Sequence, residues 1–186
     1  MVREVMQAAG AGFADIERIA VTLGPGSFTG VRTGISAARA MALATGVPVC
    51  GVSSLELMRW GAEALAGEKL AGRPSVVAVD ARRGEVYLQR FTVNGTAAAP
   101  KVLPIAVALK DMPSGSICLG SGGPLLEAAA AAAGVTPPAL LLPDLEPDAA
   151  ALVERAASLP ILTAVLPLYL RPPDAKPQTS KILPRV

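Results

Sequence analysis

The stretch Leu23-Gly-Pro-Gly-Ser-Phe-Thr-Gly-Val-Arg-Thr-Gly-Ile35 joins an apolar segment to a helix-forming one through a loop rich in glycine. The residues before the loop, Arg18–Leu23, have the pattern of a buried strand. The residues after it, Val31–Thr45, are predicted to form a helix that ends at Gly46. A strand, a glycine-rich turn and a helix in this order are typical of an α/β fold.

The glycine-rich loop also indicates an anion or nucleotide site. Glycine lets backbone amides approach a ligand closely, and a hydroxyl residue that caps the next helix leaves an N-terminus that favours an anion. The candidate residues are Gly24, Gly26, Ser27, Thr29 and Gly30. The alternative is that the loop only connects strand to helix, and the lack of a nearby P-loop lysine or acidic metal ligand favours this alternative.

Further strands and helices follow along the chain in a loose repeat. We expect strand Val47–Val52, a helix capped by Ser54 that runs to about Ala66, strands Ser75–Ala81, Glu85–Val93 and Lys101–Leu103, helix Pro104–Lys110, strand Ser116–Leu119, helix Leu125–Ala133, strand Ala139–Leu142 and helix Asp148–Ser158. The second half thus has the order β-β-β-α-β-α-β-α, and the first half has the same order without its three opening strands. A second glycine loop, Gly120–Gly123, stands where the repeat requires it and allows the same two interpretations. We expect a shortened first domain at 1–70, a second at 75–170 and a disordered basic tail at 171–186.

Small residues recur at every fourth position of the helix after the first loop, at Gly34, Ala38, Ala42 and Gly46. A row of small residues lets another element approach closely. That element is either a sheet or helix of the same domain or a helix of a partner, and the spacing leaves both open.

Composition excludes several classes of enzyme. The 186 residues include no histidine, which rules out a histidine-based catalytic triad, a zincin motif and a histidine general base. The two cysteines, Cys50 and Cys118, lie in apolar runs and are expected to be small buried hydrophobes in a reducing compartment. No metal site is expected.

The charge is nearly balanced, with a net of +2. Because Arg171–Val186 carries four cations and one carboxylate, the rest of the chain is slightly acidic, so composition indicates no basic face for nucleic acid. No apolar run is long enough to span a membrane, and no signal-peptide pattern is present. A cytoplasmic protein is expected.

Two further segments receive structural interpretations. Asp80, Arg82, Arg83 and Glu85 flank a predicted hairpin turn and are expected to face solvent. The segment Tyr169–Arg171 is expected to dock on the body of the protein, with Arg171 either in a contact or solvated.

Four stretches of the chain resemble one bacterial family, TsaB (also called YeaZ), and they stand in that family's order. They are Leu23–Ile35, Gly51-Val-Ser-Ser-Leu-Glu56, Val79-Asp-Ala-Arg-Arg-Gly-Glu-Val-Tyr87 and Pro167-Leu-Tyr-Leu-Arg171. The resemblance implies the actin-like ATPase fold (ASKHA, ribonuclease H-like), with two lobes that each contain the β-β-β-α-β-α-β-α unit.

The resemblance also implies a function. Members of this family do not catalyse; they dimerise with a TsaD homologue, the transferase that forms threonylcarbamoyladenosine next to the anticodon of tRNA, and a small ATPase, TsaE, joins them. The implied partners are therefore TsaD, TsaE and, through the complex, tRNA, with a homodimer as an alternative. The implied interface is the helix that carries Gly34, Ala38 and Ala42. No cofactor is implied, apart from ATP or ADP at a shared interface.

The chain departs from the family at its start. Family members begin with a strand and a hairpin before a helix of which Met1–Gly10 is the second half, so nucleotide binding by the first lobe is in doubt. A catalytic kinase or ATPase of the same fold is the alternative function, and a glycoprotease-like peptidase is the third.

Overall fold

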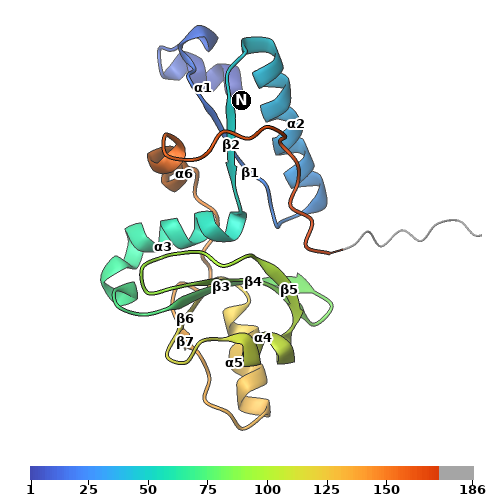
Figure 1. Ribbon diagram of the computed structural model, residues 1–186, viewed down its shortest axis with the longest axis vertical. Coiled ribbons are helices and arrows are strands. Elements are labelled where there is room, and N and C mark those ends of the chain that lie inside the picture. Colours follow the sequence, from blue (N-terminus) through green and yellow to red (C-terminus); the bar gives the residue numbers. More distant parts are fainter. Residues whose placement is uncertain (172–186) are drawn as a thin grey trace, which may run out of the picture.

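The computed structural model describes residues 1–171 and shows two β-sheets one above the other along the long axis of the molecule, with a helix between them (Figure 1). The predicted tail beyond Arg171 lies outside the described residues. The helices are α1 (Val2–Ala8), α2 (Phe28–Thr45), α3 (Ser54–Leu70), α4 (Ile105–Asp111), α5 (Gly123–Ala132) and α6 (Ala149–Ala156), with a 3₁₀ turn at Phe13–Asp15. The strands are β1 (Ile19–Thr22), β2 (Val49–Val52), β3 (Ser75–Arg82), β4 (Glu85–Phe91), β5 (Lys101–Pro104), β6 (Ile117–Leu119) and β7 (Ala139–Leu140).

The upper sheet consists of β1 and β2, which run parallel with Ile19 opposite Val49. Helix α2 covers one face, where Ile19, Ala38 and Val49 form a buried cluster. Helices α3 and α6 cover the other face through a cluster that contains Val52, Leu57 and Leu152. Burial of these aliphatic side chains is what holds so small a sheet in place, because two strands alone are marginal in water.

The lower sheet has the strand order β5-β4-β3-β6-β7, with β3 at its centre. Successive residues of β3 point to opposite faces, so Val77 packs toward α3 while Val76 and Ala78 pack toward α4 and α5. Residues of β3 that are apolar on both faces are what a central, doubly covered strand requires. The element order from β3 to α6 is the β-β-β-α-β-α-β-α unit expected from the sequence.

The two halves of the chain exchange helices. Helix α3, from the first half, packs on the lower sheet through Leu55, Met58 and Ala62. Helix α6 and the segment after it, residues 160–171, pack on the upper sheet, and we call this segment the strap. Figure 1 shows the strap crossing β2 and then running beside α2. The division into domains at 1–70 and 75–170 therefore stays a prediction. In the structure, each half of the chain contributes a helix to the sheet of the other half.

Several element ends differ from the expected ones for local reasons. Helix α2 begins at Phe28 rather than Val31, because the Ser27 hydroxyl accepts the Gly30 amide at 3.1 Å and caps the helix there. The cap of α3 is Ser53, not Ser54, and the helix continues past a kink at Ala66 to Leu70. Strand β7 stops at Leu140, two residues before Leu142 takes a φ of +52° that no ladder accommodates.

The outer edge of β1 carries no partner strand among the described residues. The Ile19 amide donates to the Pro48 carbonyl just before β2, and the Leu23 amide donates to the Val52 carbonyl at the end of β2. The backbone groups of Ala20 and Thr22 therefore point the other way. No helix in the described part of the chain is both long enough and apolar enough to cross a bilayer.

Candidate functional site

The first glycine loop is held from several sides by backbone hydrogen bonds. The Gly24 carbonyl accepts the Ser54 amide at 2.8 Å, and the Leu23 carbonyl accepts the Leu168 amide at 2.7 Å. Gly24 has a φ of +102°, and a Cβ there would lie 3.4 Å from the Leu168 carbonyl oxygen, so a glycine suits both the conformation and the close strap. Its position is thus fixed by α3 and by the strap.

The loop residues predicted to bind an anion are split by their environment. Gly24 is buried, whereas Gly26, Ser27, Thr29 and Gly30 are exposed at the N-terminus of α2. The Ser27 hydroxyl accepts the Gly30 amide as the helix cap, so its first role is structural. An anion site at this loop stays a prediction.

The four family-like stretches, which are far apart in the sequence, meet along the strap. The loop stretch bonds to the Gly51–Glu56 stretch through Gly24 and to the Pro167–Arg171 stretch through Leu23. The third stretch, Val79–Tyr87, joins through Arg171, which donates to the Ala81 carbonyl at 3.2 Å and pairs with the Glu85 carboxylate. Of the two interpretations of Arg171, the structure thus supports a contact rather than a solvated charge.

An aromatic and arginine cluster stands at the start of α2, where the strap passes. The Phe28 and Tyr169 rings stack with centroids 6.1 Å apart and an interplanar angle of 26°. The Arg32 guanidinium lies 3.8 Å above the Phe28 ring, and its Nε donates to the Tyr169 hydroxyl at 2.6 Å. Both rings stay largely in solvent, with 61% of Phe28 and 52% of Tyr169 exposed. Exposed stacked rings of this kind are a feature that the sequence did not reveal, because the two residues are remote along the chain.

The second glycine loop uses its amides internally. The Gly122 amide donates to the Ala78 carbonyl at 2.9 Å, and the Gly123 amide donates to the Gly120 carbonyl at 3.0 Å. A Cβ on Gly122 would lie 2.8 Å from the Ala78 carbonyl carbon. These glycines are therefore explained by the close approach of β3, which is the connecting role rather than the ligand role.

The small residues on α2 differ in their surroundings: some pack on the sheet and others face solvent. Ala38 is only 5% exposed and packs with Ile19 and Val49, and Ala42 packs against the same cluster. The side chains of both alanines contact the chain's own sheet, and their part in a partner interface stays a prediction. Gly34 is exposed and remains available.

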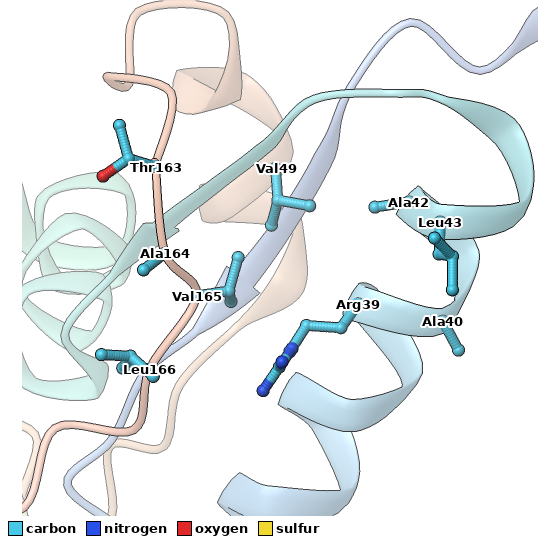
Figure 2. Close-up of a pocket in the computed structure, with 9 residues that line it drawn as sticks. All are labelled: Arg39, Ala40, Ala42, Leu43, Val49, Thr163, Ala164, Val165 and Leu166. Atoms are coloured by element: carbon cyan, nitrogen blue, oxygen red, sulfur yellow. The ribbon is translucent and has the colours of Figure 1, made fainter.

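A cavity of about 620 Å³ lies between α2, β2 and the strap (Figure 2). Arg39 extends from α2 toward the strap, and Val49 and Val165 lie opposite each other in its wall. No sequence pattern predicted this cavity, because its walls are joined only in the folded chain.

Among the ionisable groups that the structure describes, the cysteines are buried and no cluster of metal ligands forms. Burial raises the pKa of the Cys118 thiol to about 12, so this cysteine is a protonated hydrophobe at neutral pH. Cys50 is buried as well, as expected for both cysteines. Across residues 1–171, no three His, Cys, Asp or Glu side chains lie close enough together to hold a metal ion.

Comparison with solved structures defines the class of protein. YeaZ from Pseudomonas aeruginosa superposes with a TM-score of 0.70 at 27% identity, over 91% of this chain and 82% of that chain. The chain is therefore an α/β protein of the actin-like ATPase fold.

Sequence comparison then defines the family. The family model described as "TsaD: tRNA N6-adenosine threonylcarbamoyltransferase" matches residues 1–143, and the chain belongs to this family as a TsaB- and YeaZ-like member. An uncharacterized protein of Mycobacterium tuberculosis is 35% identical over 164 residues, which are 88% of this chain and 68% of that protein. The tRNA threonylcarbamoyladenosine biosynthesis protein TsaB of Escherichia coli is 42% identical over 91 residues, which are 49% of this chain and 38% of the relative.

Proposed function

We infer that the chain is a non-catalytic subunit that dimerises with and activates the TsaD homologue of its own organism. In this role it supports the formation of threonylcarbamoyladenosine next to the anticodon of tRNA, and a TsaE homologue joins the pair. The proposal rests on one observation above all. The four stretches that carry the family pattern converge on the strap and the glycine loop, and nowhere in residues 1–171 does the structure bring together three side chains able to hold a metal ion.

The chemistry at this convergence supports an accessory role. The glycine loop and α2 together contain no Asp or Glu, and the whole chain contains no histidine. The nearest carboxylate that the strap contacts, Glu85, is engaged by Arg171. Group transfer to a nucleoside needs a general base, a metal or an activated nucleophile, and the glycine loop with α2 offers no carboxylate or histidine for such a role.

We place the partner on the exposed side of α2, away from the cluster of Ala38. Gly34 and Ala37 lie on the exposed surface and are small, so a partner helix can come close to the backbone there. This assignment keeps one of the three predicted interface residues, Gly34. It replaces Ala38 and Ala42 with an exposed neighbour.

The test is co-purification with the TsaD homologue. Ala37→Arg places a long charged side chain on the proposed contact, so we expect a folded chain that no longer retains TsaD. Ala64→Arg makes the same change on an exposed position of α3 and should retain it. Each chain is also expressed in a strain depleted of its own TsaB, where threonylcarbamoyladenosine in tRNA is measured. A folded Ala37→Arg chain that binds TsaD and restores the modification would contradict the interface, and failure of the unaltered chain in both assays would contradict the function.

A further inference from the structure

One face of the molecule is free of carboxylates over a long stretch of chain. Residues 18–55 contain no Asp or Glu, and residues 156–171 contain none either. Of the three arginines in the first segment, Arg18 donates to carbonyl oxygens at the end of α6, and Arg32 and Arg39 lie on α2. In the fold these two segments supply α2 and the strap, which lie side by side (Figure 1). The nearly neutral net charge therefore hides a local separation of charge, because the carboxylates lie elsewhere on the chain.

The flank of α2 that faces the strap carries the functional groups of this face. Phe28, Arg32 and Arg39 are spaced by four and then seven residues, so they fall in one row along the helix. The row puts the Cα atoms of Arg32 and Arg39 about 10 Å apart along the helix axis, at 1.5 Å per residue. Figure 2 shows Arg39 extending toward the strap at the cavity of about 620 Å³. Neither Arg32 nor Arg39 forms an ion pair with another described residue.

The row begins, at the N-terminus of α2, with a cluster of exposed aromatic rings. The chain has only six aromatic residues, and two of them, Phe28 and Tyr169, stack on each other in solvent with Arg32 against them. Exposed apolar groups that lie together often mark a binding surface, and an arginine beside a ring adds a cation–π contact. Aromatic platforms next to a positive groove are the arrangement that binds single-stranded nucleic acid.

We propose that the groove between α2 and the strap binds single-stranded RNA, with bases stacked on Phe28 and Tyr169 and phosphates on Arg32 and Arg39. The charge decides between the candidate occupants. A polyanion matches the α2 side of this face, where Arg32 and Arg39 stand without a carboxylate partner among the described residues; the one carboxylate that pairs with the strap, Glu85, is engaged by Arg171. A protein helix is better suited to the small residues on the other flank of α2. The identification of the ligand as RNA rests on the proposed function, since the family model describes a tRNA-modifying enzyme.

The test is fluorescence anisotropy with a labelled single-stranded RNA of about ten nucleotides, within the usual site size of such grooves. Binding is measured for the full chain alone and together with the TsaD homologue, at several salt concentrations. We expect Phe28→Ala and Tyr169→Ala each to weaken binding about 5- to 100-fold without changing the salt dependence. We expect Arg39→Gln to weaken it and to lower the slope of log K against log salt by about 0.7, the value for one phosphate contact on a single strand.

Matched variants separate stacking from folding. Phe28→Tyr and Tyr169→Phe keep the rings, so their Kd for RNA should stay within about threefold of that of the unaltered chain. This is a small change on a scale where about 1.4 kcal/mol is tenfold. Arg3→Gln removes an exposed cation from α1, and Leu65→Ala removes an exposed apolar side chain from α3, so both should bind as the unaltered chain does.

Three results would overturn the proposal. They are no RNA binding with or without TsaD, equal effects of the groove variants and the controls, and loss of TsaD rather than of RNA from Phe28→Ala. Co-purification with TsaD is run on the same samples. If the chain retains TsaD but binds no RNA, the RNA-binding proposal alone is rejected. If the chain binds RNA but does not retain TsaD, the proposed function alone is rejected.

Discussion

At Gly120 the backbone has a φ of +84°, and a Cβ built there would lie 2.7 Å from the carbonyl oxygen of Ala78. Gly122 takes an ordinary helical conformation, yet its missing side chain leaves room for the same strand. The sequence predicted a glycine loop at this place, and it left open whether glycine served a ligand or a packing contact. Composition could not decide, because both need a backbone without side chains.

Substitution of Gly122 by alanine tests the packing role of the second glycine loop. Gly122→Ala puts a methyl group 2.8 Å from the Ala78 carbonyl carbon, so we expect a loss of about 2–3 kcal/mol in the free energy of unfolding. Gly61→Ala is the matched change, since a Cβ in the middle of α3 meets nothing within 4 Å. It should stabilise by about 0.5–1 kcal/mol through helix propensity. Urea denaturation of both chains measures the two values, and equal midpoints would contradict the argument.

The Cys118 thiol gives the stability a defined pH dependence. Its pKa is raised from 9.0 to about 12 by burial, so the folded chain keeps the proton that the unfolded chain loses. The contribution is complete below pH about 9 and is lost as the pH rises toward 12, by about 1.4 kcal/mol per pH unit. We expect Cys118→Ala to flatten the fall of stability over this range. Denaturation at several alkaline pH values checks it, and parallel curves for the two chains would refute it.

At the scale of elements, α2 shows what periodicity can and cannot predict. The spacing correctly identified a row of small residues, but it could not say which side the row faced, because a small residue suits a close sheet as well as a close partner. Only the packing of Ala38 on Ile19 and Val49 decides this, and that contact depends on how the strands lie. The apolar face of α3 was ambiguous in the same way, since its leucines do not specify which sheet they cover.

Helices α3 and α6 are joined by a charged cluster around Glu63. Arg59 is only 4% exposed; its Nε donates to Ser75 Oγ at 2.7 Å, while its Nη1 lies 2.9 Å from Glu63 without the alignment of a hydrogen bond. Burial lowers the pKa of the Arg59 guanidinium, and the adjacent Glu63 opposes this shift. Arg155 of α6 pairs with the same carboxylate and lies 5.0 Å from the Trp60 ring.

Removing the shared carboxylate should therefore weaken the contact between the two helices. We expect Glu63→Gln to cost about 1–3 kcal/mol, less than a fully buried pair because Glu63 is 33% exposed. Glu68→Gln removes an exposed carboxylate from the same helix and should change stability by under about 0.5 kcal/mol. Thermal melts of both chains provide the measurement. A Glu63→Gln chain as stable as the control would show that the cluster contributes nothing.

At the scale of the whole molecule, the order of elements in the second half was predictable from the sequence, and their exchange between sheets was not. Order follows from local patterns of apolar residues, glycine and proline. The contact between Leu23 and Leu168, or between Arg171 and Glu85, joins residues that no local pattern relates. The aromatic cluster and the groove likewise depend on contacts between residues that are far apart in the sequence. They exist only because the strap returns to the first half of the chain.

The exchange of α3 for α6 makes the covalent link between the halves dispensable in principle. Residues 71–74 connect α3 to β3, and cutting them leaves each piece with a helix whose apolar side chains pack in part on the other piece. Residues 1–72 and 73–186, produced as separate chains, should each be poorly folded alone and should assemble on mixing into one complex with the circular dichroism of the intact protein. Sedimentation of the mixture as two independent species would contradict this. Fragment complementation of this kind would show that the fold depends on contacts between the two halves and not on the peptide link that joins them.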